Sequence, residues 1–149
     1  MNFISNKFLL FLFRILLGFL FIYAGIEKIS DPAAFSNAIA NYKLLPFSLV
    51  NIFAITLPWV EVTAGLLLVF GVYVKENSSI IITLLIVFFI AIAISLARGL
   101  NIECGCFGTS SGAKVGLEKL VENLLLILIS AVLTKFGSNI FSLKENIND

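Results

Sequence analysis

The chain has no histidine, only two cysteines, and a charged fraction of 13% over its 149 residues. Without histidine there is no histidine general base, no histidine metal ligand and no Ser-His-Asp triad. Two cysteines are too few for the disulfide scaffold of a small secreted domain. The formal net charge is only +1. Nucleic-acid binding through a basic patch is therefore not expected.

Hydrophobic residues are abundant instead, at 60% of the chain with a mean hydropathy of +1.08. A soluble domain has about 45–50% apolar and about 25% charged residues, so lipid is the expected solvent. Apolar runs long enough to cross a bilayer cover residues 8–26, 49–70, 78–97 and 115–136. Backbone in lipid must be helical. Residues 1–149 are therefore predicted to be one transmembrane domain, an all-α integral membrane four-helix bundle.

The first loop of this bundle is predicted to contain a short interfacial helix. Asp31-Pro32 is a helix-start signal, because proline suits the first helical position. The helix is expected over residues 33–45, ending near Pro46. Lysine and arginine divide equally between the two sides of the membrane, so charge alone leaves the orientation open.

Cys104 and Cys106 are the strongest chemical signal. They are separated by one glycine in the third loop, between Arg98 and Lys114. Nearby positive charge favours the reactive thiolate. A disulfide across one residue departs from relaxed geometry, which makes it easily reduced. The pair is therefore predicted to be redox-active. Two alternatives stay open: buried, unreactive thiols, or two thiolates on a soft ion such as Cu(I) or Zn(II).

Charged residues inside the spans mark polar sites. Counted from the loop-one face, Arg14 would lie about 20 Å deep and Glu61 about 18 Å deep. The matching depths predict an Arg14–Glu61 ion pair, either structural or part of a site for a proton or a quinone headgroup. Lys28 is expected to pair with its neighbour Glu27 at the membrane interface.

Pro58 is expected to open space within the second span. An apolar cleft beside Trp59, Glu61 and the cysteine loop would admit a flat hydrophobic ring, and a quinone is the cofactor it suggests. Most of the fifteen phenylalanines are expected to face lipid. Small residues are expected at close helix contacts, namely Gly18, Ala24, Gly25, Ala64 and Gly65.

Glu122 and Asn123 lie two turns into the fourth span, below the cysteine loop. Arg98, Lys28 or Lys119 could hold them. These residues are expected to support the fold more than the chemistry. They make the loop-one and loop-three end the polar end of the bundle, where the cysteines also lie.

Several motifs occur in an order typical of one family of membrane proteins. They are Arg14-Ile15-Leu16-Leu17-Gly18, Phe21, Ala24-Gly25, Lys28, Pro32, Tyr42, Leu45-Pro46, Leu57-Pro58-Trp59-Val60-Glu61, Gly65, Gly71, Arg98-Gly99 and Cys104-Gly105-Cys106-Phe107-Gly108. The chain resembles the MauE branch of the DoxX-like membrane proteins over nearly its whole length, with the cysteine stretch the more specific signature. One departure is Glu122-Asn123, where the family pattern has Arg-Asn.

The resemblance implies a four-helix membrane bundle linked to periplasmic thiol–disulfide chemistry beside a thioredoxin-like protein. DoxX relatives are associated with quinone-linked sulfur oxidation. The resemblance also places the cysteine loop on the extracytoplasmic side of the bacterial inner (cytoplasmic) membrane.

The predicted function is a membrane thiol–disulfide oxidoreductase or electron relay, in which Cys104 and Cys106 exchange with that partner. With one cysteine pair, electrons must leave to a non-thiol carrier such as a quinone, or to a second protein. The alternatives are a non-enzymatic assembly factor or membrane anchor and a carrier of copper or zinc.

Overall fold

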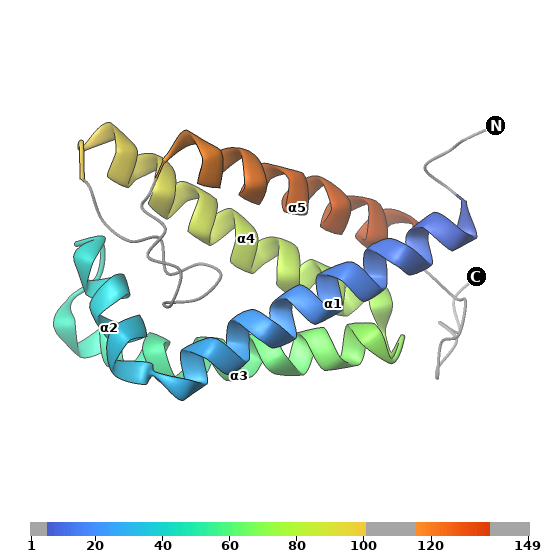
Figure 1. The fold of residues 1–149 in the computed structure, drawn as a ribbon, viewed down its shortest axis with the longest axis horizontal. Helices are drawn as coiled ribbons and strands as arrows, with labels where there is room; N and C mark the ends of the chain where they lie inside the picture. Colours follow the sequence, from blue (N-terminus) through green and yellow to red (C-terminus); the bar gives the residue numbers. More distant parts are fainter. Residues whose placement is uncertain (1–5, 101–115, 138–149) are drawn as a thin grey trace.

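The computed structural model describes residues 6–100 and 116–137. Within these ranges the chain forms helices and no strand (Figure 1). The helices are α1 (Lys7–Ser30), α2 (Pro32–Asn41), α3 (Phe47–Val69), α4 (Val74–Ala97) and α5 (Leu117–Phe136). The predicted all-α class is confirmed for this part of the chain. Cys104 and Cys106 lie outside the described residues.

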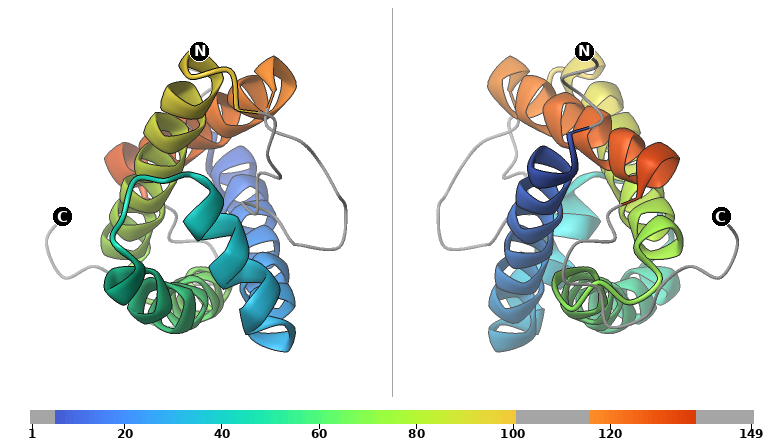
Figure 2. Two further views of the ribbon diagram at one scale, coloured as in Figure 1. Left: turned by 90° about the vertical axis from the view of Figure 1, so that its left-hand side faces the viewer. Right: turned by 90° about the vertical axis from the view of Figure 1, so that its right-hand side faces the viewer.

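The long helices form two antiparallel pairs, α1 with α3 and α4 with α5 (Figures 1 and 2). Contacts between α3 and α4, and fewer between α1 and α5, join the pairs. A buried apolar core fills the space between them. Its members are Leu10, Leu17, Phe21, Ala64, Leu68, Val74, Ile81, Leu85, Leu126 and Leu133.

Glycine sets the close approach of α1 to α3. A Cβ at Gly65 would lie 2.8 Å from the Gly18 carbonyl oxygen, and a Cβ at Gly25 would lie 2.8 Å from the Pro58 carbonyl oxygen. Because backbone atoms cannot yield as a side chain can, only glycine allows this spacing. The prediction that these glycines mark close helix contacts is confirmed. They also fix the register, with Gly18 level with Gly65 and Gly25 level with Pro58.

The short helix α2 begins as predicted. The Asp31 side chain accepts a hydrogen bond from the Ala34 backbone N–H at 3.0 Å, and Pro32 occupies the first helical position. The helix ends at Asn41, four residues before the predicted end, and Lys43 then takes a positive φ of 52°. A residue in that left-handed region cannot continue a right-handed helix. The remaining residues before Phe47 form a connection to α3.

Three helices, α1, α3 and α4, are long and apolar enough to cross a membrane. They make the chain a multi-pass membrane protein. They match the first three predicted spans, although α4 begins four residues earlier than predicted. The fourth predicted span is the helix α5, but its first two turns contain Glu118, Lys119 and Glu122. A bundle of four membrane-crossing helices, with α2 at the interface, therefore stays a prediction.

Candidate functional site

Lys28 and Glu61 form an ion pair that is buried among the helices. Lys28 Nζ lies 2.7 Å from Glu61 Oε1 and 2.8 Å from Oε2, so one ammonium holds both carboxylate oxygens. The exposed fractions of the two side chains are 0% and 2%. Lys28 stands one turn after Gly25, on the helix face that packs against α3. The close approach at Gly25 thus brings the lysine within reach of Glu61.

The predicted Arg14–Glu61 pair is wrong. Arg14 lies fourteen residues before Lys28 on α1, which is about 21 Å along the helix axis. The prediction assumed that α1 and α3 meet the loop end of the bundle at the same depth. Instead, the first turns of α3 pack on α2, where Ser36 Oγ donates a hydrogen bond to Asn51 Oδ1 at 3.2 Å. Glu61 therefore lies near the level of Gly25, and the Lys28 side chain reaches back about one turn along α1 to meet it.

Arg14 is itself buried at the other end of α1, one turn before Gly18. Its guanidinium carbon is 5.0 Å from the centre of the Phe11 ring. Arg14 is therefore remote from the Lys28–Glu61 pair and is not part of the same site.

The predicted interfacial Glu27–Lys28 pair is also replaced. Lys28 turns inward to Glu61, whereas Glu27 accepts a hydrogen bond from the Tyr23 hydroxyl at 3.1 Å. Both residues are on the last two turns of α1. The two side chains point in different directions because adjacent residues of an α-helix are about 100° apart around its axis. Glu27 therefore points away from the buried side of α1 on which Lys28 lies.

Lys28 also contacts two aromatic rings from other helices. Its Nζ is 5.1 Å from the ring centre of Phe35 on α2 and 5.2 Å from that of Phe88 on α4. Both distances are within the range of cation–π attraction. Together with Glu61 on α3, these contacts join four helices at one ammonium group.

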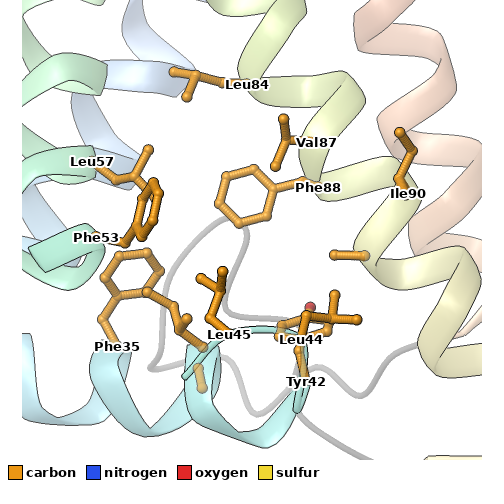
Figure 3. A pocket seen from close by; sticks show the side chains of 13 residues that line it. Phe35, Tyr42, Leu44, Leu45, Phe53, Leu57, Leu84, Val87, Phe88 and Ile90 are labelled. Atoms are coloured by element: carbon orange, nitrogen blue, oxygen red, sulfur yellow. The ribbon is translucent and has the colours of Figure 1, made fainter. Parts of the chain in front are cut away.

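The same two rings line an apolar pocket with a volume of about 380 Å³. It lies between α2, the α2–α3 connection, α3 and α4 (Figure 3). The lining residues are Phe35, Ala38, Ile39, Tyr42, Leu44, Leu45, Phe53, Leu57, Leu84, Val87, Phe88, Ile90 and Ala91. Tyr42 alone among them has a polar side-chain atom. A volume of this size suits a small organic molecule.

Tyr42 is the C-cap of α2 and lies outside the spanning helices. Its side chain is buried against Ile92, Phe88 and Leu120. Burial raises the pKa of Tyr42 to about 12, because the phenolate would lose its hydration there. The hydroxyl therefore stays protonated at neutral pH and can donate a hydrogen bond.

The residues predicted around a flat-ring cleft do not line this pocket. The Trp59 side chain is 59% exposed on the outside of α3, and Glu61 faces Lys28. Leu57, two residues before Trp59, does line the pocket, as does Phe53 one turn earlier. Helix α3 is continuous through Pro58.

The remaining predicted site residues lie on α4 and α5. Arg98 is the exposed C-cap of α4. Glu122 Oε2 accepts a hydrogen bond from Lys119 Nζ at 2.6 Å, so one of its three predicted partners is confirmed. Asn123 is 1% exposed, and neither its Oδ1 nor its Nδ2 has a hydrogen-bond partner among residues 6–100 and 116–137. Within the described part of the chain, Asn123 therefore makes no hydrogen bond to Lys28 or Glu61.

Sequence reasoning missed Phe35 and Phe88, because the phenylalanines were expected mostly to face lipid and none was assigned to a site. A signal was available in the lysine itself. A lysine inside an apolar run must find partners when it is buried. Aromatic rings on the neighbouring helices can supply such partners, because an ammonium group is attracted to the face of a ring.

Comparisons with a family model and with curated proteins point to the same family. The family model described as "Methylamine utilisation protein MauE" matches residues 6–136. The chain is 29% identical over 130 residues to the MauE protein of Paracoccus denitrificans, which covers 87% of this chain and 70% of that protein. It is 34% identical over 106 residues to MauE of Methylorubrum extorquens, covering 70% of this chain and 57% of that protein.

MauE of Methylophilus methylotrophus is 33% identical over 105 residues, covering 69% of this chain and 55% of that protein. The chain thus spans little more than half the length of two of these three relatives. No solved structure matches the chain significantly. The family match includes all five described helices, the buried ion pair and the pocket. The chain belongs to the MauE family.

Proposed function

We propose that the chain is a membrane thiol–disulfide oxidoreductase that serves methylamine utilisation. Cys104 and Cys106 would exchange electrons with an extracytoplasmic thioredoxin-like protein. The observation that carries the proposal is the cysteine pair itself, two thiols one glycine apart and the only cysteines in the chain. The family names of the relatives supply the physiological context.

The ends of α4 and α5 support this assignment. Arg98 closes α4 and Gly116 opens α5, so the segment with the cysteines starts and finishes on described helices. A cationic side chain and a helix N-terminus both stabilise thiolate over thiol. The thiolate is the form that attacks a disulfide.

The exchange proceeds through a mixed disulfide. A thiolate of the partner attacks the Cys104–Cys106 disulfide, which releases one thiolate of the pair. The second thiolate of the partner then attacks the mixed disulfide. The partner leaves with a new disulfide, and the chain keeps two thiols. Two electrons and two protons have passed from the partner to the chain. The reaction is reversible, and the two reduction potentials set its direction.

The site would lie on the extracytoplasmic side of the bacterial cytoplasmic membrane. Disulfides persist in that compartment, whereas cytoplasmic thiols are kept reduced. A single pair cannot relay electrons to a second disulfide inside the same chain. Turnover therefore needs a non-thiol acceptor, for which a membrane quinone has the right two-electron chemistry.

Alkylation in intact cells tests this proposal. A membrane-impermeant maleimide is applied before and after treatment with a reductant. The expected result is labelling of Cys104 and Cys106 only after reduction, since the resting pair would be a disulfide on the outside. A Cys104→Ser variant should lose oxidation of partner thiols, whereas the control Ser111→Ala should retain it.

Two results would overturn the redox assignment. The first is a Cys104→Ser variant that oxidises partner thiols as well as the wild-type protein does. Thiols that show no change in alkylation across a range of buffered potentials would do so as well, and would favour an assembly factor that only binds its partner. Copper or zinc in stoichiometric amounts, lost in the double serine variant, would favour a metal carrier.

A further inference from the structure

We propose that the apolar pocket between α2, α3 and α4 binds the ring of a lipid-soluble quinone. The proposal names the electron acceptor for the proposed thiol–disulfide function. The role of the ring as electron acceptor rests on that proposed function. Binding itself depends on the pocket alone. The predicted position beside Trp59 and Glu61 is replaced by one whose lining includes Phe35, Phe53 and Phe88 among aliphatic side chains.

The pocket opens toward the bilayer. Large apolar side chains on its rim are exposed on the outside of the protein, namely Leu44, Leu45, Phe53, Val87 and Ile90. Two of the three elements around it, α3 and α4, are helices long and apolar enough to span the membrane. A ligand would therefore enter from lipid, which selects a hydrophobic molecule.

The walls favour a flat ring over an acyl chain. Phe35, Phe53, Phe88 and Tyr42 come from three separate elements and surround the space (Figure 3). Aromatic side chains stack on a planar ring face to face or edge to face. The aliphatic side chains of the lining would suit a ring or an acyl chain equally, so the four aromatic side chains are what favour a planar ring. Tyr42 contributes its ring to this lining, and the surface facing the space is almost entirely apolar.

The buried ion pair holds two of these walls in place. Lys28 Nζ contacts the rings of Phe35 and Phe88 and is itself anchored to both oxygens of Glu61. Rings fixed before the ligand arrives lose little freedom on binding. Lys28 and Glu61 are thus positioning residues for the pocket.

The chemistry balances with the proposed function. When the Cys104 and Cys106 thiols join as a disulfide, they release two electrons and two protons. One quinone takes up two electrons and two protons to become one quinol. The quinone is the oxidant, and it returns to the lipid in reduced form. This step restores the disulfide that the partner consumed.

Binding is tested on the full chain in lipid nanodiscs, with both cysteines changed to serine. The probe is duroquinone, a ring without a long tail, and the readout is quenching of Trp59, the single tryptophan of the chain. Collisional quenching from lipid is linear in quinone, whereas a site saturates. We expect saturable quenching in this double serine variant.

A matched pair of substitutions on α4 locates the site. Ala91 lines the pocket and Ala93 does not. Ala91→Phe should fill the pocket and weaken saturable quenching at least about tenfold, which corresponds to about 1.4 kcal/mol. Ala93→Phe adds the same side chain two residues away and should bind as before. Should Ala91→Phe fail to fold, Phe53→Leu on the rim replaces it, with the lipid-facing Phe70→Leu as its control.

Linear quenching alone, or equal saturable quenching in the two members of a pair, would overturn the proposal. Displacement of duroquinone by decanol would also overturn it, because the pocket would then be one for chains. Since the cysteines are absent from the test protein, the binding result is independent of thiol exchange. Exchange that fails in the wild-type protein would overturn the proposed function and leave the pocket assignment intact.

Discussion

Lys28 on α1 places its ammonium 2.7 and 2.8 Å from the two carboxylate oxygens of Glu61 on α3. Neither charge would be tolerated alone in this position, because burying an isolated ion costs far more than burying a matched pair. The pair also anchors the rings of Phe35 and Phe88. One interaction therefore stabilises the helix junction and shapes the pocket beside it.

Removing one partner of this pair should be strongly destabilising. Lys28→Met leaves the Glu61 carboxylate buried without its cation, and we expect the free energy of unfolding to fall by about 3–5 kcal/mol. The double variant Lys28→Met, Glu61→Leu should recover most of that loss, since neither charge remains. Denaturant unfolding in detergent micelles, followed by circular dichroism, measures both. A single variant as stable as the wild type would contradict the burial argument.

Gly65 should not accept a larger side chain. In Gly65→Ala the new Cβ would meet the Gly18 carbonyl oxygen at 2.8 Å and the Ile22 nitrogen at 3.0 Å. Both are backbone atoms, so α1 and α3 must separate, and stability should fall by about 1–3 kcal/mol. The neighbouring Leu66→Ala faces lipid and serves as the control. Equal unfolding midpoints for the two variants would show that the helices separate without cost.

Stability should fall at high pH through Tyr42. An unperturbed tyrosine has a pKa of about 10, and burial raises the pKa of Tyr42 to about 12. The folded state therefore binds this proton more tightly than the unfolded state. Its contribution is complete below about pH 10 and is lost as the pH rises towards about pH 12.

The variant Tyr42→Phe should lack this part of the pH dependence. Unfolding midpoints at pH 9 and pH 11 give the comparison, and phenolate absorbance at 295 nm in the folded protein gives the titration directly. The difference spectrum between wild type and variant should titrate well above pH 10. A difference spectrum centred at pH 10 would mean that Tyr42 is solvated.

Asn123 should be replaceable without loss of stability. Its buried amide has no hydrogen-bond partner in the described part of the chain, and such a group costs about 1–3 kcal/mol. Asn123→Leu keeps the approximate volume and removes the polar atoms, so we expect a gain in unfolding free energy of about 1 kcal/mol. A clear loss of stability would mean that the amide is satisfied in the folded protein.

Asn123→Leu could also gain stability and lose thiol exchange, and that result would have a different meaning. It would assign Asn123 a functional role, since polar groups are retained at a stability cost mainly where function requires them. Partner-thiol oxidation measured beside the unfolding experiment separates the two cases. Glu122→Gln, on the exposed neighbour, is the matched control.

Local sequence signals were sufficient for the elements themselves. The long apolar runs predicted α1, α3 and α4, and Asp31-Pro32 predicted the start of α2, because these features act within one or two turns of the chain. They were insufficient for the end of α2. That end depends on the left-handed conformation of Lys43, for which no glycine was present as a signal.

The sequence did not predict which buried charged residues form an ion pair. The length and polarity of each helix follow from its own residues, so the chain alone determined a membrane protein of helices with charges inside the spans at Arg14 and Glu61. The burial of Lys28, which was predicted to lie at the membrane interface, was decided by packing. The relative depth of two helices depends on what packs at their ends. Here the first turns of α3 pack on α2, which brings Glu61 near the level of Gly25, within reach of the Lys28 side chain and away from Arg14. Only tertiary packing sets such offsets, and they also brought Phe35, Tyr42 and Phe88 together around one pocket.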